Sequence, residues 1–219
     1  MRIIVLIKPG VELEESDACA VEHALHVARR RLDVQVSALA TGPPTCLRSL
    51  RAALALGADD AIHLADTRTS PYDALTLSRI LATAIRELGF DLVLCGDASD
   101  TPNQSALPAM IAARLGIPAH CHASCIDFTS IDTPTLISFA RHSASPRYPP
   151  FPAIAEARQK LISTRTLPKI DLSKIDREPD SVITVKPLCP RSNTIIEADE
   201  DPHAAAVQLV DFLAARRFI

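Results

Sequence analysis

The sequence contains no tryptophan, and only 4% of its 219 residues are aromatic. Proteins that hold single-stranded nucleic acids stack the bases on aromatic side chains, so this class of partner is disfavoured. The net charge of −3 and the pI near 6.2 also give no electrostatic attraction to phosphate backbones or anionic membranes. We therefore expect an aliphatic core and no nucleic-acid partner.

Long apolar runs are missing too. No stretch approaches the roughly 18 residues needed to cross a bilayer, and the apolar segment Ile3 to Ile7 is shorter than a signal-peptide core. Hydrophobic residues at 47% against 22% charged residues are typical of soluble globular proteins. The sequence therefore predicts a cytoplasmic protein without membrane insertion.

The cysteines form no CxxC motif, and their spacing is not that of a disulfide framework. Only the segment from His120 to Cys125 combines cysteine and histidine closely enough to suggest metal binding. In a strand, Cys121 and Cys125 would point to one face and the two histidines to the other, so four ligands would not meet at one ion. We expect no metal site, and free cysteines at 19, 46, 95, 121, 125 and 189.

Short apolar segments alternate with segments of helical periodicity along the first two thirds of the chain. This alternation predicts an α/β fold with three layers, an open and mostly parallel sheet, and Rossmann-like crossovers. Residues 1–142 should form this nucleotide-binding domain, and residues 143–219 a proline-rich loop, an extended arm and a C-terminal helix from Pro202 to Arg217. The expected strands are 2–8, 34–39, 61–64, 91–95 and one from Pro118, and the expected helices begin at 17, 45, 73 and 104.

In such a sheet, ligands bind at the carboxyl ends of the strands, where helix N-termini present free N–H groups. The loop after the strand at 91–95 is the richest in suitable groups. It contains Asp100, Thr101, Asn103, Gln104 and Ser105. These residues predict a nucleotide phosphate site, or alternatively a hydrogen-bonded turn with Asn103 as helix cap. No GxGxxG or GxxxxGKS motif is present.

Catalytic patterns are weaker. His23 and His26 lie three residues apart on the first predicted helix, where a solvent-facing surface is the simplest explanation, and His63 lies in a strand. The sequence has neither a GxSxG motif nor the residue order of a Ser-His-Asp triad. We expect no catalytic residues.

Several stretches, in this order along the chain, resemble the beta subunit of electron transfer flavoproteins, a family that includes the FixA-type proteins. The most specific stretch is Thr41–Leu64, with its Gly-Pro turn, helix and Ala-Leu-Ala-x-Gly-Ala-Asp segment. Together the matches extend over nearly the whole chain. They are RIIVLIKPG (Arg2–Gly10), DACAVEHAL (Asp17–Leu25), TGPPTCLRSLRAALALGADDAIHL (Thr41–Leu64), DLVLCG (Asp91–Gly96), AARLGIP (Ala112–Pro118), PRYPPFPAIAEARQK (Pro146–Lys160) and LVDFLAARRFI (Leu209–Ile219).

This resemblance implies an electron carrier and not an enzyme with its own turnover. In the family, the beta subunit pairs with an alpha subunit that holds most of the FAD, and itself binds AMP as a structural ligand. Carried over to this sequence, the AMP-binding positions are Leu6, the stretch Glu14–Asp17 with Ser16 and Asp17, Thr41, Asp100, Thr101, Asn103, Gln104, Ser105 and Ala106. In the same way, Phe151 matches the apolar anchor that enters a pocket of dehydrogenase partners, with Arg147 and Tyr148 in the same motif.

The sequence also departs from the family. Glu14-Glu15 replaces the usual Asn-Pro and would repel a phosphate directly, the nucleotide loop is short, and the aromatic residue that approaches the flavin is missing. Two other hypotheses stay open for these reasons: a beta-like structural subunit without nucleotide, and a free-standing adenine-nucleotide-binding domain. A beta subunit of the bifurcating kind, with its own FAD in place of AMP, is a further variant.

Overall fold

The computed structural model describes residues 1–66, 73–97, 106–125, 128, 132–166, 201–216 and 218. The predicted nucleotide residues Asp100 to Ser105 therefore lie outside the described part. The chain divides into two compact units, Met1–Asp176 and Arg177–Ile219.

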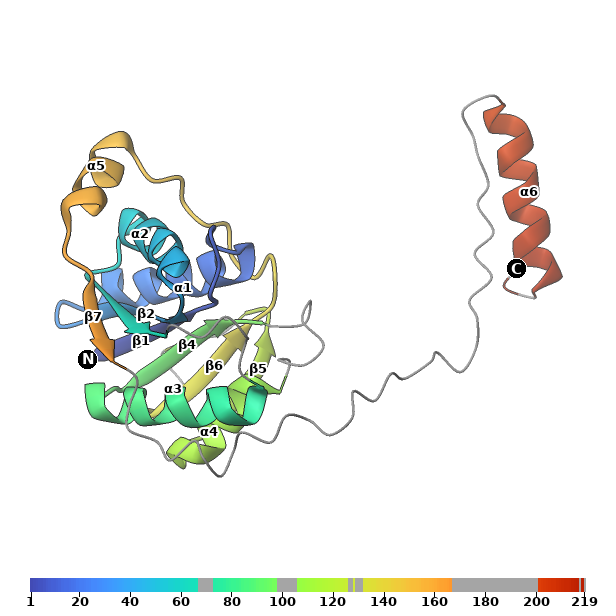
Figure 1. The fold of residues 1–219 in the computed structure, drawn as a ribbon. Helices are drawn as coiled ribbons and strands as arrows, with labels where there is room; N and C mark the ends of the chain where they lie inside the picture. The colour runs from blue at the N-terminus through green and yellow to red at the C-terminus, as the bar shows by residue number, and fades with distance from the viewer. Residues whose placement is uncertain are drawn as a thin grey trace. The chain divides into compact units, whose positions relative to one another are not determined.

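The first unit is built on a seven-stranded sheet in which all paired strands run parallel. The strand order is β5-β6-β4-β1-β2-β3-β7. This arrangement confirms the predicted α/β class (Figure 1). The strands are β1 (Arg2–Ile7), β2 (Gln35–Gly42), β3 (Asp60–Ala65), β4 (Leu92–Gly96), β5 (Ala119–Ala123), β6 (Thr135–Phe139) and β7 (Ser163–Thr166).

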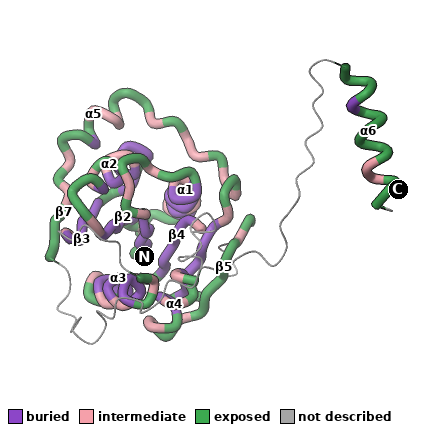
Figure 2. Tube along the Cα trace, turned by 45° about the vertical axis from the view of Figure 1, so that its right-hand side comes forward, coloured by how far each residue is buried: buried purple, intermediate pink, exposed green. Residues whose placement is uncertain are grey.

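Helices cover both faces of this sheet (Figure 1). The central strand β1 shows why, because Ile3 and Val5 enter the core beneath one helical layer while Ile4 and Leu6 enter the core beneath the other. Figure 2 shows the central strands and the inner sides of the helices buried. One layer holds α1 (Glu15–Arg30), η1 (Pro44–Cys46), α2 (Leu47–Leu56) and α5 (Phe151–Gln159), and the other holds α3 (Ala74–Leu88) and α4 (Leu107–Leu115).

The strand order reverses beside β1. From β1 the chain proceeds outward through β2 and β3, then returns to β4 on the other side of β1. In open α/β sheets, ligands bind at such a switch point, outside the carboxyl ends of the strands. The loops that follow Ile7 and Gly96 meet here.

Element boundaries differ from the prediction at several helices. Asp73 caps α3 as expected, since its side chain accepts a hydrogen bond from the Thr76 amide at 2.7 Å. Thr45 was expected to cap the next helix but lies inside the 3-10 turn η1. The helix expected from Gln104 begins at Leu107, with Ala106 as its N-cap residue.

The sequence analysis missed three elements between residues 132 and 166. Strand β6 is fully buried between β4 and β5. Helix α5 and strand β7 lie in the region that was expected to be a proline-rich loop followed by an extended arm, and β7 pairs with β3 at the edge of the sheet. Helix α5 was missed because prolines precede it and occur in its first turn. Strand β7 was missed because its exposed residues Ser-Thr-Arg-Thr show no alternation of polar and apolar positions.

The described part of the second unit is the helix α6 (Pro202–Ala215). Asp201 caps it by accepting hydrogen bonds from the amides of His203 and Ala204. Val207, Leu209 and Val210 are exposed on this helix. Within the described residues, no helix combines the length and the apolar character that crossing a membrane requires.

Candidate functional site: a cavity at the switch point and an exposed aromatic segment

A cavity lies at the carboxyl ends of the central strands. Its enclosed volume is about 50 Å³, and it opens to solvent. Side chains from both sides of the switch point form its wall, and most of them are apolar. The lining residues are Leu6, Ile7, Lys8, Pro9, Asp17, Leu39, Thr41, Leu77, Leu81, Cys95, Gly96, Leu107, Pro108 and Ile111.

Three of the predicted nucleotide residues meet in this cavity. Leu6 contributes apolar surface from β1, Thr41 comes from the end of β2, and Asp17 comes from the first turn of α1. All three are buried. Parallel strands end at the same edge of the sheet, so residues that are distant in the sequence converge there.

Asp17 and Thr41 line this apolar cavity, and each has a buried polar atom, of which Asp17 Oδ1 lies close to the Gly96 backbone. Within the described residues, Asp17 Oδ1 and Thr41 Oγ1 are buried and have no hydrogen-bond partner. Leaving a buried polar atom without a partner costs about 1–3 kcal/mol. Two such atoms among the residues of one cavity could be satisfied by a ligand or by a water molecule.

Burial governs the charge of Asp17. Asp17 is 1% exposed, and the loss of hydration raises the pKa of its carboxyl group from 3.8 to about 7. The Lys8 backbone amide, which donates to Oδ2 at 2.7 Å, and the Lys8 ammonium group oppose this shift but do not cancel it. Near neutral pH the group is divided between its protonated and ionised forms, so it can donate or accept a hydrogen bond.

Gly96 allows α1 to approach the end of β4 closely. A Cβ atom at this position would lie 2.6 Å from the Ser16 carbonyl carbon and 2.7 Å from the Asp17 nitrogen, and it would overlap Asp17 Oδ1. Only a residue without a side chain fits there. The glycine thereby places the Asp17 carboxyl group at the cavity wall.

Lys8 joins the two loops at the switch point. Its ammonium group donates to Glu14 Oε2 at 2.6 Å, to Ser16 Oγ at 3.1 Å and to the Asp97 carbonyl at 2.9 Å. All three ammonium protons are thus used. The arrangement holds the loop before α1 against Asp97, the residue that follows β4.

Glu14 and Glu15 both take part in ion pairs. Glu14 and Glu15 were expected to repel a phosphate, but each carboxylate faces a basic group. Glu14 pairs with Lys8, and Glu15 pairs with His142 Nδ1 at 2.8 Å and Arg141 Nε at 3.9 Å. These contacts weaken the repulsion that the sequence alone suggested.

The remaining predicted nucleotide residues cannot all be placed. Ser16 is buried in the first turn of α1 and accepts the hydrogen bond from Lys8. Ala106 is exposed and precedes α4, beside the cavity residues Leu107 and Pro108. Asp100, Thr101, Asn103, Gln104 and Ser105 are outside the described residues.

His122, one of the two histidines considered as metal ligands in the sequence, lies beside Asp97. His122 Nδ1 is bonded to Asp97 Oδ2, and the His122 amide donates to Ser138 Oγ at 2.9 Å. His122 has a φ of 59°, and the register of β5 against β6 shifts between His120 and Ala123. The side chains of residues 120–125 therefore do not simply alternate between the two faces of a strand, as the sequence analysis assumed. Across the described stretches of the chain, no three His, Cys, Asp or Glu side chains are arranged to hold a metal ion.

Two other histidines have clear packing roles. His23 was expected on a solvent-facing surface, but its ring stacks on Phe139 at 3.9 Å between centroids, and its Nε2 lies 3.2 Å from Ser143 Oγ. Burial lowers its pKa. His63 is buried, with Nε2 2.9 Å from the Gly42 carbonyl oxygen, whereas His26 is exposed as expected.

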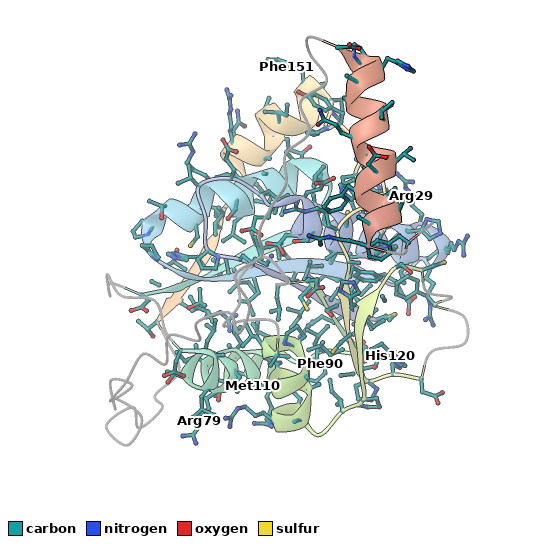
Figure 3. All side chains as sticks on the ribbon, turned by 90° about the vertical axis from the view of Figure 1, so that its right-hand side faces the viewer. Arg29, Arg79, Phe90, Met110, His120 and Phe151 are labelled. Atoms are coloured by element: carbon teal, nitrogen blue, oxygen red, sulfur yellow. The ribbon has the colours of Figure 1, made fainter. Side chains whose placement is uncertain are left out.

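The predicted partner-binding motif lies on the opposite side of the sheet from α3 and α4. Tyr148 and Phe151 are 94% and 78% exposed. Phe151 begins α5, and Figure 3 shows it at the outer end of that helix, far from Arg79 and Met110. Both rings are therefore accessible to a partner. Arg147 differs from these rings, because its guanidinium group is bonded to Glu22 on α1.

Comparisons with known proteins agree with this architecture. The family described as "Electron transfer flavoprotein domain" matches residues 3–142. The electron transfer flavoprotein subunit beta of Mycobacterium tuberculosis H37Rv is 29% identical to this chain, over 94% of the chain and 87% of that protein. The subunit of the same name from Megasphaera elsdenii is 26% identical, over 93% and 86%. The one from Bacillus subtilis is 24% identical, over 90% and 83%.

Proposed function

The chain belongs to the electron transfer flavoprotein family as a beta subunit, and from this we propose that it forms a heterodimer with an FAD-carrying alpha subunit. The heterodimer receives electrons from flavin-dependent dehydrogenases and passes them to a downstream acceptor. In this role the chain is a carrier subunit and not an enzyme. The match along 94% of the chain supports the assignment.

We further propose that the cavity at the switch point binds the adenosine part of AMP. A flat heteroaromatic base fits a wall made mostly of leucine, isoleucine and proline side chains. Amine and hydroxyl groups of the ligand would pair with Asp17 Oδ1 and Thr41 Oγ1, the two atoms that lack partners among the described residues. This pair of buried atoms is the observation that carries the ligand proposal.

The phosphate should lie away from Asp17, because an ionised carboxylate would repel it. The first turn of α4 borders the cavity, and the backbone N–H groups of Leu107 and Ala109 could donate to a phosphate there, whereas Pro108 has no N–H group. With a ligand in place, α1, β1, β2 and α4 would all contact one molecule. The nucleotide would therefore act as part of the structure and would not itself carry electrons.

Co-expression with a candidate alpha subunit tests both proposals. The purified complex should show a flavin absorption spectrum, and mass spectrometry of the denatured complex should find one AMP for each beta subunit. The beta chain purified alone should be colourless. Stoichiometric FAD on the beta chain alone would contradict the AMP proposal and indicate the bifurcating kind.

A pair of variants tests the cavity. Thr41→Val removes the unpartnered hydroxyl group and keeps the shape of the side chain, so AMP content should fall at least about threefold while the nucleotide-free protein keeps its stability. Thr83→Val is the matched control, because Thr83 lies outside the cavity on α3 and its hydroxyl group already donates to the Arg79 carbonyl oxygen. Equal nucleotide in both variants, or none in the parent complex, would favour a structural subunit without nucleotide.

A further inference from the structure

One face of α1 carries a row of side chains that hold the segment leading to Tyr148 and Phe151. These α1 residues are spaced at i, i+4, i+7 and i+8, so they lie on the same side of the helix. Each contacts a different point of the segment from residue 141 to 147. The contacts join Glu15 to His142, Cys19 Sγ to the Ala144 carbonyl oxygen, Glu22 to Arg147, and His23 to Ser143.

The last of these contacts along the segment involves the most hydrogen bonds. Arg147 Nε and Nη2 each donate to a Glu22 carboxylate oxygen at 2.7 Å, and the Arg147 amide donates to the same carboxylate at 3.3 Å. The side chains are only 28% and 16% exposed. The bonds from Arg147 lower the pKa of Glu22, so the carboxylate stays ionised at neutral pH. A bidentate pair of this kind fixes the orientation of the Arg147 guanidinium group as well as its distance from the Glu22 carboxylate.

A second arginine holds the far end of the motif. Arg51 on α2 donates to the Ala157 carbonyl oxygen at 2.5 Å and also to that of Lys160, at the C-terminal end of α5. Lys160 in turn donates to the Ala58 carbonyl oxygen at 3.3 Å. The two exposed rings thus lie on a stretch of chain that is fixed at both ends.

We propose that Glu22, Arg147 and Arg51 are positioning residues that hold Tyr148 and Phe151 ready for the dehydrogenase. The proposal rests on the proposed function, in which Phe151 is the partner's anchor. Arg147 was expected to contact the partner directly. In this proposal it acts instead through its pairing with Glu22, which positions the neighbouring rings. A segment that is already ordered loses less conformational entropy on binding, so it binds more tightly with the same contacts.

Trypsin digestion of the assembled heterodimer tests the positioning without any dehydrogenase. The Arg147–Tyr148 bond is a possible trypsin site, and a fixed segment resists cleavage. Glu22→Gln removes the charge that holds Arg147, so cleavage at this bond, identified by mass spectrometry, should become at least about threefold faster. Glu87→Gln, an exposed position on α3, is the control and should leave the rate unchanged. An unchanged rate in Glu22→Gln would overturn the proposal.

Kinetics test whether the positioning serves electron transfer. We expect Glu22→Arg and Arg147→Glu each to raise the KM for the heterodimer roughly threefold to tenfold, with kcat nearly unchanged, when a dehydrogenase that reduces the parent complex is the electron donor. The double variant restores opposite charges and should recover much of the loss. Absence of any recovery, with both single variants impaired, would overturn the pairing.

Phe151→Ala separates this inference from the proposed function. If Phe151→Ala slows reduction of the heterodimer by the dehydrogenase and the Glu22 and Arg147 variants do not, then Phe151 is the anchor and the positioning role is wrong. If Phe151→Ala has no effect while Glu22→Gln still exposes the Arg147–Tyr148 bond, the segment is positioned as we infer, but the proposed role of the anchor is wrong.

Discussion

At the scale of single residues, Asp17 shows how burial can matter more than residue type. An aspartate at the start of a helix is normally an exposed, ionised group that complements the helix dipole. Here the side chain is buried at the cavity wall, and burial raises its pKa to about 7. The unfolded chain has the ordinary value of 3.8, so the folded state binds the proton more tightly.

This difference predicts a pH dependence of stability. Between about pH 4 and pH 7 the unfolded chain has lost the Asp17 proton while the folded chain keeps it, so stability falls as the pH rises. Asp17→Asn cannot titrate. The stability of this variant relative to the parent should therefore increase by roughly 2–4 kcal/mol from pH 4 to pH 8, measured by urea unfolding of the nucleotide-free proteins.

The parent protein, measured over the same pH range, provides the control. All other groups are shared by variant and parent, so the difference between them isolates Asp17. A difference that does not change with pH would mean that the Asp17 carboxyl group ionises as it does in the unfolded chain.

At the scale of elements, the cavity depends on how closely α1 lies against the end of β4. The contact is possible because Gly96 has no side chain. Gly96→Ala should push α1 away, lower the free energy of unfolding by about 1–3 kcal/mol as overpacking does, and reduce bound nucleotide. Denaturant unfolding and mass spectrometry would measure the two effects.

Gly116→Ala separates packing from backbone strain. Gly116 has a φ of +74°, and a Cβ there would have nothing within 4 Å. The strained backbone of Gly116→Ala should lower the free energy of unfolding by only about 1 kcal/mol, and the variant should keep its nucleotide. Full nucleotide content in Gly96→Ala would contradict the idea that close contact between α1 and β4 forms the site.

At the scale of the whole molecule, the division into Met1–Asp176 and Arg177–Ile219 predicts separable roles. The sheet and its two helical layers belong entirely to the first unit. Removal of residues 177–219 should therefore leave a folded protein, with a thermal midpoint within about 5 °C of the parent as expected for a small change in stability.

The same truncation should abolish pairing with the alpha subunit, because the exposed apolar residues of α6 are expected to pack on that partner. Co-purification with a tagged alpha subunit measures this directly. A truncated chain that still pairs would mean that the first unit forms the interface, and one that does not fold would mean that the two units are not independent.

The sequence by itself determined the type and order of most elements. Apolar strands such as Arg2–Ile7 and helices such as Ala74–Leu88 follow from local periodicity and capping, which depend on neighbouring residues only. The family followed from motifs spread along the chain, and the comparisons confirmed it. Leu6, Asp17 and Thr41 were found through that resemblance, and the structure brings them together.

The tertiary structure alone decided what those residues experience. No local pattern shows that Asp17 is buried, that its helix packs against Gly96, or that Lys8 bonds the Asp97 carbonyl oxygen. Glu22 and Arg147 are 125 positions apart, and folding alone brings them to 2.7 Å. Burial and long-range contact arise from the packing of whole elements, so charge states and positioning roles appear only once the chain is folded.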